Sequence, residues 1–103
     1  MSTTSDRNDP GINVDRGDGQ NKTYLVLTDD ERANGFVRPV RKSYVHLICG
    51  GRTKIGLAIA ETYARNPTFY GATFCCHCGK HFVLRDADGS HSFVWDDGSP
   101  VGD

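Results

Sequence analysis

The chain has 103 residues, a formal net charge of -1 and 37% hydrophobic residues, which leaves room for one small domain. No segment is long and apolar enough to predict a membrane span, and the N-terminus lacks the basic and then apolar pattern of a signal peptide. We therefore expect a cytoplasmic protein, in which four cysteines indicate metal or redox chemistry more than disulfides.

The N-terminal segment 1–22 is rich in Ser, Thr, Asp, Asn and Gly. It cannot bury enough apolar surface to offset the entropy lost on ordering, so its composition predicts a disordered tail. The folded domain is then expected at 23–98, with a frayed C-terminus at 99–103. A domain of this size buries only about 60% of its unfolded surface and needs a further constraint, which a metal site would supply.

Local signals place several elements within this domain. A β-prone run at 24–27 precedes Thr28 and, three residues later, Glu31, which is the spacing of a helix capping box. Alternation of apolar residues over 43–48 predicts a strand.

The clearest helix is predicted over 54–65, because apolar residues recur every fourth position among alanines. Thr53 is its expected N-cap, and Asn66-Pro67 is its expected stop, since the residue before a proline avoids helical backbone angles. Beyond it, 80–85 and 91–95 are expected to form a β-hairpin joined by a polar turn.

Two pairs of candidate metal ligands share one spacing. His46 and Cys49 are separated by two residues, as are Cys75 and Cys78, and Gly79 follows the second pair. This gap lets two side chains from one tight turn reach the same ion, and the glycine relieves the tight backbone. Two such pairs fill a zinc tetrahedron with no open position, so we expect one structural Zn²⁺ per chain. Its binding energy, roughly 10 kcal/mol or more, would become folding energy.

The same residues allow other interpretations. His81 could replace His46 as a ligand, whereas Cys76 is left out because only one residue separates it from Cys78. A thioredoxin-like redox motif needs a helix after the cysteines, but a strand-like sequence follows Gly79. A zinc deaminase needs a glutamate two residues after its histidine, and none follows His46 there. A structural disulfide would need an oxidising compartment, which nothing in the sequence indicates.

Charge is distributed unevenly along the chain. The segment 36–54 carries only basic charges, whereas 86–103 carries only acidic ones. The basic residues could neutralise phosphates, which makes nucleic-acid binding the alternative function. The two regions could equally neutralise each other. The candidate nucleic-acid contacts are Arg38, Arg41, Lys42, Arg52 and Lys54.

The expected function is binding rather than catalysis, because no spacing links groups that could form an active site. Aromatic side chains often anchor protein interfaces, so Phe69, Tyr70 and Trp95 are candidate contacts, although they could equally fill the core. We expect a monomer or small homo-oligomer that docks on a protein partner and binds no membrane.

Three stretches resemble a group of small proteins of bacteriophages and prophages: GFVRPVRKSYVH at 35–46, GLAIAETYARNP at 56–67 and FYGATFC at 69–75. The resemblance implies a bacterial cytoplasm during infection and nothing about mechanism. The small size, the closed metal site and the absence of catalytic spacing make the expected function that of a phage-type binding or regulatory module that docks on a host or phage protein. The C-x-x-C-G element at 75–79 resembles the zinc ribbons, a fold used for nucleic-acid and protein contacts. The expected fold is thus a small α+β zinc-ribbon-like domain, with one central helix between the ligand pairs and a C-terminal β-hairpin.

Overall fold

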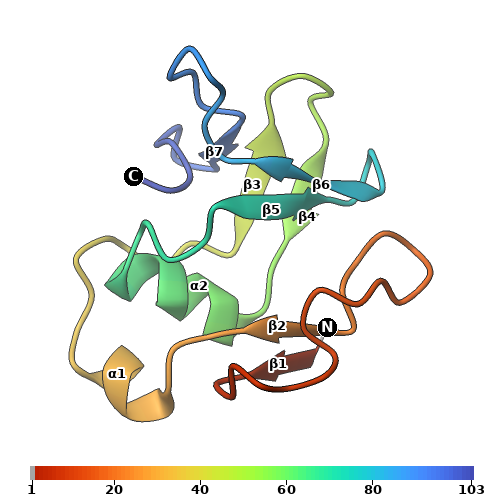
Figure 1. The fold of residues 1–103 in the computed structure, drawn as a ribbon. Helices are drawn as coiled ribbons and strands as arrows, with labels where there is room; N and C mark the ends of the chain where they lie inside the picture. The colour runs from red at the N-terminus through yellow and green to blue at the C-terminus, as the bar shows by residue number, and fades with distance from the viewer. Residues whose placement is uncertain (1) are drawn as a thin grey trace.

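Short strands and two helices follow one another along a small α+β fold (Figure 1), seen in a computed structural model that describes residues 2–103. Met1, the first residue of the expected tail, lies outside the described residues. The elements are β1 (Ser2–Thr4), β2 (Thr23–Leu25), α1 (Asp29–Ala33), β3 (Ser43–His46), β4 (Arg52–Lys54), α2 (Leu57–Arg65), β5 (Ala72–Cys75), β6 (Lys80–Val83) and β7 (Phe93–Trp95).

The strands form three small sheets. β3 lies at the centre of an antiparallel sheet of order β4-β3-β7, and β5 pairs antiparallel with β6. The third sheet is the parallel pair β1-β2. None of the helices in residues 2–103 is long and apolar enough to cross a membrane.

The core lies between α2 and the β4-β3-β7 sheet. Tyr44 on β3 meets Phe93 and Trp95 edge-on, with ring centroids 5.2 and 5.8 Å apart, and Tyr63 from α2 meets Trp95 at 5.1 Å. Trp95 is only 2% exposed. The prediction of an interface role is therefore wrong for Trp95, and the alternative core role is confirmed, because β7 turns this side chain toward α2.

Helix α2 begins later than the sequence predicts. Thr53 is not its N-cap but a buried residue of β4, opposite Tyr44 in the sheet. The N-cap is Gly56, which makes no side-chain capping bond. The helix ends at Arg65 with Asn66 as C-cap, as the proline signal predicts, and the capping box of Thr28 at α1 is also confirmed. Pairing with β3 keeps Lys54 in a strand, and the Ile55 amide donates to the Lys42 carbonyl at 2.8 Å, so the helix begins only after Gly56.

The expected C-terminal hairpin is divided between two sheets. β6 pairs with β5, and β7 pairs with β3, so the two predicted strands meet at an isolated bridge between Arg85 and His91. The predicted frayed end at 99–103 is also wrong as a description of the structure. Val101 is 0% exposed, and its amide donates to the carbonyl of Phe93 at 3.0 Å.

The expected disordered tail also differs from the structure, which shows residues 2–22 folded against β2. β1 pairs with β2, and the Lys22 amide donates to the Val14 carbonyl at 2.7 Å. Aspartates hold the intervening turns: Asp15 accepts from the Gly17 amide at 2.6 Å, and Asp18 from the Gln20 amide at 3.0 Å. Residues counted as disorder signals thus satisfy backbone groups in turns.

Candidate metal centre

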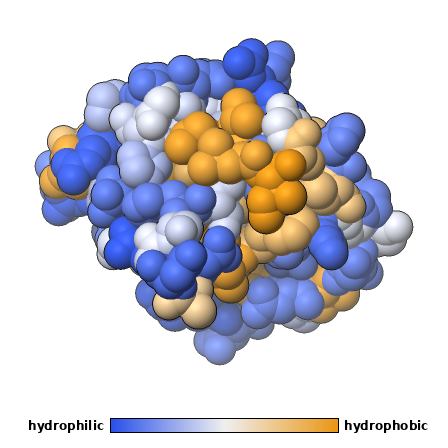
Figure 2. Space-filling view, turned by 90° about the horizontal axis from the view of Figure 1, so that it is seen from above, coloured by the Kyte–Doolittle hydropathy of each residue, from blue (hydrophilic) through white to orange (hydrophobic). Residues whose placement is uncertain are grey.

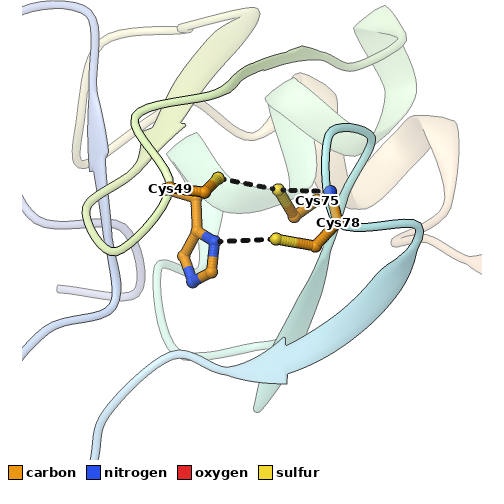
Figure 3. A group of neighbouring side chains, drawn as sticks. Cys49, Cys75 and Cys78 are labelled. Atoms are coloured by element: carbon orange, nitrogen blue, oxygen red, sulfur yellow. Dashed lines mark hydrogen bonds between the residues drawn. The ribbon is translucent and has the colours of Figure 1, made fainter.

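Two tight turns bring the four predicted ligands together (Figure 3). His46 ends β3, and Cys49 lies in the turn that leads to β4; we call residues 46–50 the first knuckle. Cys75 ends β5, and Cys78 lies in the turn that leads to β6; residues 75–79 are the second knuckle. The knuckles face each other because β4 and β5 are neighbours, with the Cys76 amide donating to the Thr53 hydroxyl at 3.0 Å.

The two knuckles have the same backbone form. The Gly50 amide donates to the His46 carbonyl at 2.7 Å, and the Gly79 amide donates to the Cys75 carbonyl at 2.8 Å. Both glycines have φ of 72°, a left-handed conformation that other residues adopt only under strain. Sequence reasoning singled out only the second glycine, although the first follows its cysteine in the same way.

The ligand atoms lie at distances that suit a tetrahedral ion. The three sulfurs and the imidazole nitrogen all lie within 4.8 Å of one another. Cys49 Sγ is 3.5 Å from Cys75 Sγ, and Cys78 Sγ is 3.7 Å from His46 Nδ1. Zinc bonds of about 2.0–2.3 Å at tetrahedral angles place neighbouring ligand atoms roughly 3.5–3.8 Å apart. The residues present therefore fit a metal ion.

Amides and neighbouring thiols set the ionisation of the cysteines. Partial burial acts to raise the pKa of Cys49, but hydrogen bonds from the Gly51 amide and from the other thiols outweigh it, so this pKa is lowered. Burial and the thiols of Cys49 and Cys75 raise the pKa of Cys78 to about 11. Clustered thiols cannot all ionise in the absence of a cation, because the negative charges of the thiolates repel one another. A bound cation would remove this conflict.

Packing prepares His46 as a ligand. Its ring is 0% exposed and lies between Phe82 and Phe93, with centroids 4.4 and 4.6 Å away. Burial lowers the pKa of His46, which favours the neutral imidazole that binds metals. Nδ1 faces Cys78, while Nε2 is buried without a hydrogen-bond partner among residues 2–103. Aromatic packing therefore orients this ring in place of a second-shell hydrogen bond.

The alternative ligands lie away from the cluster. His81 Nε2 is 2.9 Å from the Tyr24 hydroxyl, with which it shares a hydrogen bond. Cys76 is exposed, and its thiol donates to the Arg52 carbonyl at 3.2 Å. The structure therefore favours His46 over His81 and leaves Cys76 outside the site, as the spacing indicated.

The acidic C-terminal region folds back onto the basic run. Arg41 is 3.4 Å from the Asp97 carboxylate, and Arg52 is 3.1 Å from that of Asp96. The Arg38 guanidinium also donates to the backbone carbonyl of Asp103 at 3.2 Å. Three of the five candidate nucleic-acid contacts are thus engaged by the protein itself, which favours the interpretation that the two regions neutralise each other.

The other candidate contacts are partly buried, and two exposed residues were missed. Phe69 and Tyr70 are half-buried, and the Tyr70 hydroxyl donates to the Leu25 carbonyl at 2.6 Å. In contrast, Leu47 and Ile48 on the first knuckle are 54% and 80% exposed. Their exposure could have been predicted from the sequence, because Leu47 and Ile48 lie between the ligands His46 and Cys49. Side chains between two ligands of one ion point away from that ion.

No protein-family model, curated protein or solved structure matches the chain. The candidate site consequently stands on its own geometry. That geometry shows a His/Cys cluster compatible with a metal ion on a small α+β fold.

Proposed function

We propose that this chain is a zinc-stabilised binding module that docks on a protein partner. The observation that carries the proposal is the four-residue cluster itself, in which three sulfurs and one nitrogen converge within 4.8 Å. Thiolate and imidazole ligands in a tetrahedral set favour zinc over harder cations. Because all four positions are filled by protein, the ion would serve stability rather than catalysis.

The ion would act by joining two separate β-hairpin turns. Each knuckle supplies two ligands, one from the end of a strand and one from the turn that follows. Zinc would therefore tie the β4-β3-β7 sheet to the β5-β6 pair in a zinc-ribbon-like arrangement, with α2 between the ligand pairs in sequence. For a chain this small, the metal-binding energy would become a large part of the folding energy.

The first knuckle supports protein rather than nucleic-acid binding. Figure 2 shows apolar side chains gathered on the face seen from above, which is the face where the turn between β3 and β4 stands in Figure 1. Leu47 and Ile48 are exposed on that turn. Large apolar side chains held in water by a rigid turn favour contact with a protein. The resemblance to phage proteins would place that partner in a bacterial cytoplasm.

The test is native mass spectrometry before and after a strong chelator, with circular dichroism of both samples. We expect one zinc per chain and loss of structure when the zinc is removed. A folded protein without metal would contradict the proposal. For docking, wild type and Ile48→Asp would be compared for capture of bacterial proteins. Equal capture of the same proteins would contradict a role for this surface.

A further inference from the structure

The N-terminal loop packs against the second knuckle. Gly19 approaches Gly79 so closely that a Cβ added at Gly19 would lie 1.8 Å from the Gly79 carbonyl oxygen. The same added atom would lie 3.2 Å from Cε1 of Phe74, the residue before the ligand Cys75. The loop therefore touches the backbone whose shape belongs to the metal site.

A second contact fastens this loop to the β5-β6 pair. The Asn21 amide donates to the Tyr24 hydroxyl at 3.1 Å, and that hydroxyl shares the 2.9 Å hydrogen bond with His81. His81 lies opposite Phe74 in the sheet, with ring centroids 5.4 Å apart. The loop is thus linked to the strands on both sides of the second knuckle.

The loop has internal order but little apolar surface. The Arg16 amide donates to the Gln20 carbonyl at 2.8 Å, and the Lys22 amide donates to the Val14 carbonyl at 2.7 Å. Polar and glycine residues dominate the segment, so hydrophobic burial contributes little to its position. Backbone contacts such as the Thr23 amide with the Gly11 carbonyl, at 3.1 Å, hold its start to β2, and its position on the β5-β6 pair depends on the few specific contacts described above.

Metal binding would fix the conformation of the second knuckle. The Cys78 amide donates to Cys75 Sγ at 3.4 Å, and the Gly79 amide donates to the Cys75 carbonyl. Ligation of both sulfurs would hold this turn and the Gly79 carbonyl in one place. Without an ion, three clustered thiols would no longer be drawn together, and the turn would lose that constraint.

We propose that residues 11–22 form a strap whose docking is coupled to metal binding at the second knuckle, an inference that rests on the metal site of the proposed function. The strap seats on the turn that the filled site holds and is released when the site is emptied. By thermodynamic linkage, docking then raises metal affinity by the same factor by which metal strengthens docking.

Release of the strap would change a second part of the surface. Ile12, Asn13 and Asn21 of the strap line a groove whose other lining residues include Phe69 and Tyr70. These two aromatics were candidate partner contacts, and they are half-buried while the strap is seated. Release of the strap would remove one wall of the groove that these aromatics line.

Two neighbouring glycines offer a matched test. Gly17 and Gly19 both have positive φ, 111° and 94°, so alanine is strained at either position. At Gly19 the added Cβ meets the knuckle backbone, whereas at Gly17 no atom of residues 2–103 lies within 4 Å of it. Gly19→Ala should unseat the strap, whereas Gly17→Ala reproduces the backbone strain and keeps the knuckle contact.

The measurement is the zinc dissociation constant of both variants and of wild type, by competition with a chromophoric chelator. We expect Gly19→Ala to bind zinc about tenfold more weakly than Gly17→Ala, within the usual range of coupling between sites. In the zinc-loaded Gly19→Ala protein, hydrogen exchange at the Arg16 and Lys22 amides should also be faster than in the zinc-loaded Gly17→Ala protein.

Each outcome decides one question. Equal zinc affinity of the two variants would overturn the coupling and leave the zinc site intact. A wild-type protein that binds no zinc would overturn the proposed function itself. If Gly19→Ala does not fold, Tyr24→Phe replaces it, because it removes only the hydroxyl between Asn21 and His81. It should weaken zinc binding about threefold, since it removes one of two contacts, and an unchanged affinity would overturn the coupling.

Discussion

The first and second knuckles share a backbone but differ in their surroundings. Both place two ligands three residues apart, and both end in a glycine with φ of 72°. The first presents Leu47 and Ile48 to solvent, whereas Gly19 of the N-terminal loop packs on the second. The comparison shows that ligand spacing and glycine define the metal-binding form, while the contacts around each turn distinguish their roles.

The largest expected effect tests whether the knuckles contribute equally to the site. Cys49→Ser and Cys75→Ser should each abolish tight zinc binding and cooperative folding, because zinc binding supplies roughly 10 kcal/mol or more in such sites. Cys76→Ser is the matched control, since this exposed thiol lies outside the cluster. Thermal unfolding followed by circular dichroism checks this. Loss of folding in only one of the two ligand variants would show that the two knuckles do not contribute equally to the metal site.

A smaller effect is expected at the glycines that end the two turns. Gly50→Ala and Gly79→Ala should each cost about 1 kcal/mol of unfolding free energy, because alanine is strained at positive φ. Within the described part of the chain, an added Cβ meets nothing within 4 Å at Gly50, and at Gly79 it meets the Asp18 carbonyl at 4.0 Å. Urea denaturation measures both values. A much larger cost at Gly79 would show that the strap distinguishes the two turns.

The free energy of unfolding should depend on pH through His81, which lies on β6, the strand that follows the second knuckle. Burial lowers the pKa of His81, although Asp15 acts in the opposite direction. As the pH falls below about 6.5, the unfolded chain takes up a proton that the folded chain resists, so the free energy of unfolding decreases. Above that pH, His81 is neutral in the folded and the unfolded chain, so it does not make the free energy of unfolding depend on pH.

His81→Gln should therefore lose less stability than wild type when the pH is lowered from 7 to 5. Both proteins are compared with zinc bound, so that protonation of the ligands affects them alike. Denaturation curves at several pH values measure the slopes. Parallel slopes would mean that His81 does not titrate on unfolding.

The smallest effect is expected at the exposed tip of the first knuckle. Ile48 is 80% exposed, so Ile48→Ser should change the unfolding free energy by no more than about 0.5 kcal/mol. Denaturation of the zinc-loaded variant checks this. A loss well above that value would show that Ile48 packs within the protein and is not free for a partner.

Local signals in the sequence predicted the features that depend on residues a few positions apart. The spacing of His46 with Cys49 and of Cys75 with Cys78 indicated the four residues that the structure brings together. The capping box at Thr28 and the stop at Asn66 are likewise found where the sequence placed them. In each case, the feature depends on the backbone geometry of a few consecutive residues.

Tertiary structure alone decided the features that depend on distant partners. Thr53 became a strand residue because β3 lies beside it, and Trp95 became core because α2 covers it. Val101 is buried against β7, and the aspartates of the N-terminal segment cap turns. Strand pairing and burial join residues far apart in sequence, so composition and local propensity could not assign them.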